Sequence, residues 1–193
     1  MKIKTNIATA TPDMASHIAS LIMEAMNPQC CQNFAGSQHT LVDFHRMMTR
    51  LVEMEDSQYS YRNTLVATNT EGILMGILVA YDGAQLKTLR ERFVQEAIVS
   101  FGIDYSGMEA ETESGEFYFD SLAVSSNFRG KGVAHQLLQA GIERARELGI
   151  PKVGLLCDKG NPDAERLYAK VGFQYVEDTT WGGHAMKRLQ INV

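Results

Sequence analysis

The chain has 193 residues, of which 45% are hydrophobic and 21% are charged, a composition typical of a folded globular domain with a sizeable core. This composition excludes a disordered chain, a collagen-like repeat and a small disulfide-stapled protein. Eighteen basic residues oppose 23 acidic ones, and the net charge of −5 gives no overall attraction to nucleic acid or to an anionic membrane. We therefore expect a single domain over residues 1–193, with neither nucleic acid nor membrane as a partner.

The cysteines and histidines are scattered along the chain. Cys30 and Cys31 are adjacent and Cys157 stands alone, so there is no CxxC pair and no metal-ligand spacing. We expect no metal site. The longest apolar run, 73–80, is too short to span a bilayer, and the first residues lead into no signal-peptide core. These features predict a cytoplasmic location.

Hydrophobic periodicity and turn residues predict alternating strands and helices. In the first half we expect a strand at 2–8, a helix capped by Thr11 and reaching Met26, a helix at 40–55, strands at 65–68 and 73–81, and a helix at 84–101. In the second half we expect a strand at 117–124, a helix at 133–148, a strand at 153–157, a helix that begins at Asn161 and ends at Gly172, and strands at 174–176 and 185–189. This order predicts an α/β layer with at least one parallel strand pair.

An acidic stretch precedes the strand at 117–124. Six acidic residues and no Lys or Arg occur between Asp104 and Asp120. One interpretation is a solvated loop, because runs of charge are usually on the surface. The other is an acidic rim that attracts a cationic substrate, with Asp120 and Glu116 at its inner end.

Residues 129–134 lie between the end of a predicted strand and the start of a predicted helix. The first N–H groups of a helix lack intrahelical partners and carry partial positive charge. Gly130 and Gly132 allow the backbone to approach a bulky anion, and Arg129 and Lys131 add formal positive charge. The segment therefore predicts a phosphate cradle, with a tight turn as the alternative interpretation.

Two well-known phosphate motifs do not fit this segment. A Walker loop needs GxxxxGK[ST], which the chain lacks. A dinucleotide fingerprint needs a small residue three positions after the second glycine, where this chain has His135.

The segment does resemble the cofactor motif of the GNAT superfamily of N-acetyltransferases, which use acetyl-coenzyme A. That motif is Arg or Gln, two variable residues, Gly, one variable residue and Gly or Ala; here Arg129, Gly132 and Ala134 occupy its defining positions. Residues 161–173 are similar to the family's downstream motif, N-x-x-A-x-x-L-Y-x-x-x-G-F. The resemblance is strong over 117–189, and 82–115 looks like an insertion that carries a helix.

The resemblance implies an α/β fold with a mixed, mostly antiparallel twisted sheet, flanked by helices and splayed between the fourth and fifth strands, here 117–124 and 153–157. Acetyl-CoA would be the co-substrate, its pantetheine arm pairing with backbone of the fourth strand as an added strand would. The implied cofactor-binding residues are Leu122, Ala123 and Val124 for pantetheine, Arg129, Gly130, Lys131, Gly132, Val133 and Ala134 for the pyrophosphate, and Asn161 and Tyr168.

The same resemblance implies direct attack of an amine on the thioester. Tyr168 would protonate the departing thiolate, although a tyrosine on the inner face of a helix is also a common packing residue. For the base, Asp120, Glu116, ordered water and no dedicated base remain open, because this chain has Tyr118 where some members have an acid. We expect Asp120 to share a strand face with Leu122.

Two further side chains have simpler interpretations. His184 follows Trp181-Gly182-Gly183 and is an alternative base, or a capping or packing residue. Cys157 ends a buried strand and is interpreted as a small apolar residue.

We therefore expect an N-acetyltransferase that moves acetyl from acetyl-CoA to a primary amine through a ternary complex. The acceptor is expected to be a cationic small molecule or peptide, and a homodimer is left open. Two other classes stay open. The first is a non-catalytic acyl-CoA sensor, and the second is a nucleotide-binding α/β enzyme that takes NAD.

Overall fold

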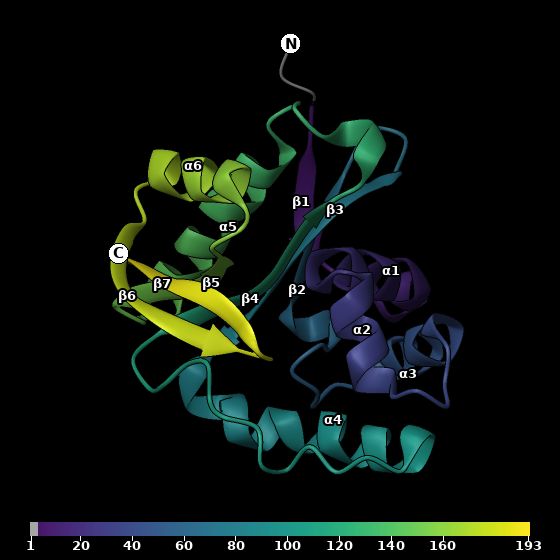
Figure 1. The fold of residues 1–193 in the computed structure, drawn as a ribbon. Helices are drawn as coiled ribbons and strands as arrows, with labels where there is room; N and C mark the ends of the chain where they lie inside the picture. The colour runs from purple at the N-terminus through teal and green to yellow at the C-terminus, as the bar shows by residue number, and fades with distance from the viewer. Residues whose placement is uncertain (1–3) are drawn as a thin grey trace.

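The computed structural model describes residues 4–193, which form one sheet with helices on both faces (Figure 1). Its strands are β1 (Asn6–Thr9), β2 (Thr64–Thr68), β3 (Leu74–Asp82), β4 (Phe117–Val124), β5 (Lys152–Asp158), β6 (Gln174–Trp181) and β7 (His184–Asn192). Its α-helices are α1 (Ala15–Met26), α2 (Pro28–Ala35), α3 (Leu41–Glu53), α4 (Leu86–Phe101), α5 (Val133–Glu147) and α6 (Pro162–Val171). Lys2 and Ile3, expected in the first strand, lie outside the described residues.

The sheet is mixed and mostly antiparallel, in the order β1-β2-β3-β4-β5-β7-β6. Within residues 4–193, β4 and β5 form the parallel pair, and they pair only where Phe117–Phe119 faces Val153–Leu155. Beyond Phe119 the two strands diverge, so β4 keeps its neighbour β3 on one edge and has no strand on the other. The expected splay between the fourth and fifth strands is confirmed.

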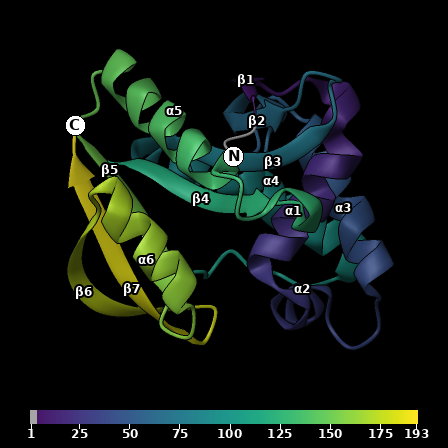
Figure 2. The ribbon, with the colours of Figure 1, turned by 90° about the horizontal axis from the view of Figure 1, so that it is seen from above.

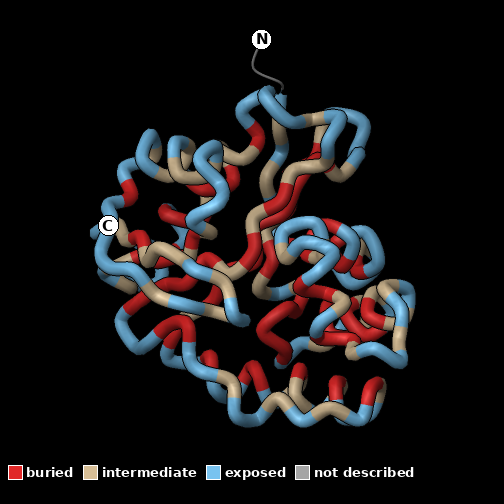
Figure 3. The backbone as a smooth tube through the Cα atoms, in the orientation of Figure 1, coloured by how far each residue is buried: buried red, intermediate tan, exposed pale blue. Residues whose placement is uncertain are grey.

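Two apolar clusters hold the helices to opposite faces of the sheet. Residues of α1, α2, α3 and α4 share the first cluster with β3 and β4, and residues of α5 and α6 share the second with β3, β4 and β5. Figure 2 shows α5 and α6 well separated from α1, α2 and α3. Buried residues are concentrated in the central strands and on the inward sides of the helices (Figure 3).

Local sequence chemistry explains several helix positions. Thr40 and Asp43 form a reciprocal capping box at the start of α3. The side chain of Asn161 accepts a hydrogen bond from the N–H of Ala164 and so caps α6. On α5, a Cβ at Gly141 would lie 2.6 Å from side-chain atoms of both Leu78 and Phe119, so only glycine lets this helix approach the sheet closely.

The predicted elements are largely confirmed, with three differences. The helix α2 was not predicted, and α1 is preceded by a 3₁₀ turn at Pro12–Met14 whose N-cap, Thr11, makes no side-chain capping bond. The last two strands are longer than expected and pair as a hairpin. The helix expected in 82–115 is α4, which packs on α3. No helix among residues 4–193 is both long enough and apolar enough to cross a membrane.

Candidate functional site

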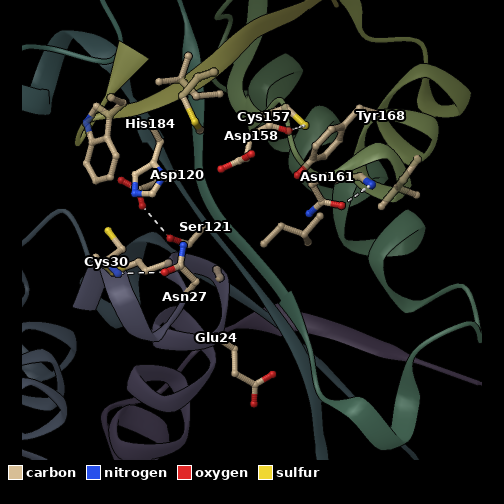
Figure 4. A pocket seen from close by; sticks show the side chains of 18 of the residues that line it. Glu24, Asn27, Cys30, Asp120, Ser121, Cys157, Asp158, Asn161, Tyr168 and His184 are labelled. Carbon is tan, nitrogen blue, oxygen red and sulfur yellow. Dashed lines mark hydrogen bonds between the residues drawn. The ribbon is translucent and has the colours of Figure 1, made fainter. Parts of the chain in front are cut away.

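A cavity of about 650 Å³ opens where β4 and β5 diverge. Its walls come from the α1–α2 region, from β4 and β5, from α6 and from the β6–β7 hairpin. In Figure 4, Tyr168, Asn161 and Cys157 lie on one side of the cavity, and Asp120 and Ser121 lie on the other. The divergence of the strands therefore brings together side chains from both halves of the chain.

The loop before α5 has the open backbone that a phosphate requires. Gly130 and Gly132 have φ values of +72° and +84°, which side-chain-bearing residues rarely adopt, and a Cβ at either would meet nothing within 4 Å. Within the described residues, no acceptor is found for the N–H groups of 130–135, because the first helical bond is from Gln136 to Gly132. These donors and the positive end of α5 face open space, as an anion site needs.

The two basic side chains of this loop are already engaged. Arg129 donates from Nε to the carbonyl of Val124 at 2.9 Å and from a terminal nitrogen to Glu24 at 3.0 Å. Lys131 donates to the carbonyl of Asn127 at 2.8 Å. The cradle therefore depends mainly on backbone N–H groups, and Arg129 ties the loop to the end of β4.

The free edge of β4 borders the cavity beside this loop. Leu122 and Val124 line the cavity, and with Ala123 they pair with β3 on the opposite edge only. A strand edge of this kind presents N–H and C=O groups to which an extended ligand can hydrogen-bond. Of the predicted cofactor-binding residues, Leu122, Val124, Arg129 and Ala134 line the cavity, and Ala123 lies between two of them on the same strand.

Asp120 occupies a β-bulge in β4. Val79 pairs with Ser121 and Ala80 pairs with Phe119, so Asp120 is the extra residue between them. The bulge changes the face of the strand that Asp120 occupies. Leu122 packs on the α5–α6 cluster, whereas Asp120 hydrogen-bonds to Tyr81, which belongs to the opposite cluster. The expectation that Asp120 and Leu122 share a face is therefore wrong.

Three donors hold the Asp120 carboxylate. Tyr81 donates its hydroxyl to Oδ2 at 2.8 Å, Gln58 donates its amide to the same atom at 3.3 Å, and Ser121 donates to Oδ1 at 2.8 Å. Burial, followed by the negative charge of Glu111, raises the pKa of Asp120 to about 6, although the hydrogen bonds from Tyr81 and Ser121 act in the opposite direction. A half-buried carboxylate with a pKa near neutrality is suited to accept a proton at physiological pH.

The acidic stretch before β4 divides into exposed residues (Asp104, Glu109 and Glu113) and residues with partners inside the protein. Glu116 is 1% exposed and accepts hydrogen bonds from Gln190 at 2.7 Å and Arg188 at 3.3 Å. It lies outside the cavity lining and connects β4 to β7, so the structure gives it a packing role. Glu111 lines the cavity but is ion-paired with the buried Arg90. The stretch therefore brings Glu111 and Asp120, and not Glu116, to the first cavity.

Tyr168 and Asn161 project from α6 into the cavity. The ring of Tyr168 packs edge-on against Phe173, with centroids 5.9 Å apart, and within residues 4–193 its hydroxyl has no hydrogen-bond partner. Burial, with a smaller effect of Cys157, raises the pKa of Tyr168, so the phenol stays protonated. Asn161 uses its carbonyl oxygen as the cap of α6, which leaves its amide nitrogen for a ligand.

His184 and Cys157 also line the cavity, His184 from the start of β7 and Cys157 from β5. Burial raises the pKa of the Cys157 thiol to about 11, which suits the apolar role predicted for it. The supporting residues Gln58 and Tyr81 and the pair Arg90–Glu111 were not predicted. No short-range sequence signal marks them, because each acts on a partner far away in the chain. In the described part of the chain, no group of three or more His, Cys, Asp or Glu is placed to hold a metal ion.

Comparison with known proteins agrees with this geometry. The sequence pattern of the acetyltransferase (GNAT) family matches residues 53–173. A GCN5-related N-acetyltransferase 4, chloroplastic, of Arabidopsis thaliana is 35% identical over 74 residues, which are 37% of this chain and 25% of the relative. The match thus spans about a quarter of that relative's length.

Solved structures are similar over nearly the whole chain. A crystal structure described as an acetyltransferase is 28% identical, covers 97% of this chain and 99% of its own, and superposes with a TM-score of 0.79. The fold is also shared by an N-acetyltransferase from Staphylococcus aureus Mu50, at 21% identity, coverage of 96% and 100%, and a TM-score of 0.80. The family pattern matches more than half of the chain and agrees with the splayed sheet, so this chain belongs to the GNAT family of acetyltransferases.

Proposed function

We propose that the protein transfers an acetyl group from acetyl-CoA to a primary amine, by direct attack within a ternary complex. The observation that carries this proposal is the single cavity at the splay of β4 and β5. It joins a phosphate-binding loop, a free strand edge, a carboxylate of raised pKa and a protonated phenol. Family membership supplies the acetyl donor, since GNAT enzymes use acetyl-CoA.

The cofactor would lie along the β4 edge. Its pyrophosphate would accept hydrogen bonds from the free N–H groups of 130–135, and its pantetheine amides would pair with Leu122, Ala123 and Val124. The carbonyl of Val124 already accepts from Arg129, so pairing there would use the remaining groups of the edge. The amide of Asn161 would contact the cofactor from α6.

The amine must attack as a free base, although only about one part in a thousand is neutral at pH 7.4 for a pKa near 10.4. As its nitrogen forms a bond to the thioester carbonyl carbon, that nitrogen becomes positively charged and must lose a proton. Asp120 accepts this proton, because its hydrogen bonds fix the carboxylate beside the cavity.

The negative charges of the oxyanion and of the leaving thiolate would be stabilised by groups of β4 and α6. The carbonyl oxygen becomes an oxyanion, which a backbone N–H on the free edge near Val124 would stabilise. When the carbon–sulfur bond breaks, the sulfur leaves as a thiolate and takes a proton from Tyr168. The products are the N-acetyl amine and CoA, and solvent then moves one proton from Asp120 back to Tyr168.

The proposal is tested in two steps on the purified protein. First, acetyl-CoA should raise the melting temperature in a concentration-dependent manner, while NAD should not. Second, thiol release should depend on an added primary amine. Stabilisation by acetyl-CoA without release for any amine would point to an acyl-CoA sensor, and stabilisation by NAD alone would point to a nucleotide enzyme.

A further inference from the structure

A second cavity, of about 370 Å³, adjoins the first one. Cys30 and Trp181 line both cavities, so the two spaces meet at these residues. The other walls come from Phe34 of α2, from Tyr105 and Met108 in the loop after α4, and from the β6–β7 turn. The loop after α4 belongs to the segment 82–115, so this cavity depends on a part of the chain that lies outside the two sequence motifs.

The walls of the second cavity are mainly aromatic and apolar. The ring of Phe34 lies 6.0 Å from that of Trp181 and 5.1 Å from that of Tyr105, centroid to centroid. The Tyr105 hydroxyl donates to the carbonyl of Phe34 at 3.0 Å, so this polar group is satisfied within the wall. Aromatic walls with few polar groups favour a flat, uncharged ligand group.

The charged side chains that line the two cavities further restrict the kind of acceptor that can bind. Glu109 is the charged side chain of the second cavity, and it is exposed. The first cavity is lined by Glu24 and Glu111, which are ion-paired with Arg129 and Arg90, and by Asp120 and Asp158, for which no ion pair is found among the described residues. Its one guanidinium, Arg129, is bound to Glu24 beside the phosphate loop. An acceptor with an ammonium group meets complementary charge here, whereas one with a carboxylate meets repulsion and no free cation.

Building on the proposed function, we propose that the acceptor is a small arylalkylamine. Its amino group lies beside Asp120, a short chain passes Cys30 and Trp181, and its uncharged ring occupies the second cavity. The absence of a carboxylate is part of the proposal and distinguishes an arylalkylamine from an aromatic amino acid.

The test measures kcat/KM at saturating acetyl-CoA for phenethylamine, n-butylamine, phenylalanine and phenylalanine amide. Phenethylamine should exceed both n-butylamine and phenylalanine by about tenfold or more, because n-butylamine lacks the ring and phenylalanine carries a carboxylate. Equal values of kcat/KM for phenethylamine and n-butylamine would overturn the second cavity as the binding site of the ring (the ring site) and leave the transferase proposal standing. A clear preference for phenylalanine amide would overturn the small-amine acceptor in favour of a peptide N-terminus.

Two pairs of variants link the preference to the second cavity. Trp181→Ala should raise KM for phenethylamine by about tenfold and KM for n-butylamine by clearly less, because n-butylamine reaches Trp181 only with its chain. Trp181→Phe should restore most of the loss. Tyr175→Ala is the matched control, since this exposed aromatic is on the same strand and lines neither cavity. Glu109→Arg should raise kcat/KM for 4-carboxyphenethylamine, whose carboxylate is on the ring that occupies the second cavity, and Glu113→Arg, the same charge change outside both cavities, should not.

Binding can be read without turnover because Trp181 is the chain's single tryptophan. Phenethylamine should change its fluorescence saturably, at a concentration about tenfold lower than n-butylamine requires. If no amine releases thiol, the transferase proposal fails, and this fluorescence then decides the ring site on its own. A response to neither amine, or an equal response to both, would overturn the ring site.

Discussion

The hydroxyl of Tyr81 on β3 lies 2.8 Å from Oδ2 of Asp120 on β4 and donates a hydrogen bond to it. The contact exists because Asp120 is the extra residue of a β-bulge, which turns its side chain to the face that Tyr81 occupies. Tyr81 is buried, and burial together with the charge of Asp120 raises its pKa, so it remains a donor throughout the working pH range. The strand pair thus presents an oriented carboxylate to the cavity.

Replacing Asp120 with Asn should lower the single-turnover rate by roughly 10²-fold or more, because the attacking nitrogen loses its proton acceptor. In the parent, the carboxylate is the active form, so activity should fall as pH drops through the Asp120 pKa of about 6. Deprotonation of the amine adds a second dependence at higher pH in both proteins. If Asp120→Asn still loses activity as the pH drops through about 6, that loss belongs to the titration of another group.

Tyr81→Phe should raise the pH at which kcat/KM falls as Asp120 becomes protonated. The hydroxyl of Tyr81 favours the ionised carboxylate, and its removal leaves burial and Glu111 to raise the Asp120 pKa further. Stability should fall by about 1 kcal/mol for the lost hydrogen bond. The measurement is the pH dependence of kcat/KM at saturating acetyl-CoA, and a fall that stays at the same pH or moves to lower pH contradicts the assignment.

Asp120→Asn should also change how stability depends on pH. The folded-state pKa of Asp120 is about 6 and its ordinary value is 3.8, so the folded protein binds this proton more tightly than the unfolded chain. The ionised carboxylate therefore costs stability above pH 6, and this cost disappears as pH falls below 4. The stability of the variant relative to the parent should increase between pH 4.5 and 8 by on the order of 2 kcal/mol. Urea unfolding at both pH values measures it, and an unchanged difference would show that the carboxylate titrates normally.

Tyr168→Phe should separate chemistry from packing. The ring contact with Phe173 is retained, so melting temperature and affinity for acetyl-CoA should change little. Loss of the phenol should lower the single-turnover rate by roughly 10²-fold. Single-turnover conditions are required because slow product release can mask a chemical step in kcat. A rate within a few-fold of the parent would make Tyr168 a packing residue.

Gly132→Val should weaken acetyl-CoA binding strongly, because a branched side chain at φ +84° strains the loop and occupies the space before the N–H groups. Gly149→Val is the matched control, since Gly149 has φ +68°, also faces open space and lies at the other end of α5. Both variants should lose comparable stability. Calorimetric titration with acetyl-CoA distinguishes them, and equal affinities would place the cofactor elsewhere.

Features that depend on neighbouring residues were predictable from the sequence. Asn161 caps α6 through a bond to Ala164, only three residues away, and the glycines at 130 and 132 fit the left-handed turn that starts α5. The periodicity of apolar residues located most helices and strands within a few residues. The resemblance of the two motifs to those of the GNAT family implied the splayed sheet, and the structure confirms it.

Features that depend on distant residues were decided only by the tertiary structure. The bulge at Asp120 arises from its register with β3, and a shift of one position moves a side chain to the other face of the sheet. Glu116 and Glu111 look alike in the acidic stretch, yet one meets Arg188 and the other meets Arg90, contacts that no short-range pattern encodes. The second cavity likewise exists only because the loop after α4 folds against α2 and the last hairpin. Short-range hydrogen bonds and hydrophobic periodicity can therefore be predicted from the sequence, because they involve residues close together in the chain. Strand register and long-range ion pairs depend on how the whole chain packs.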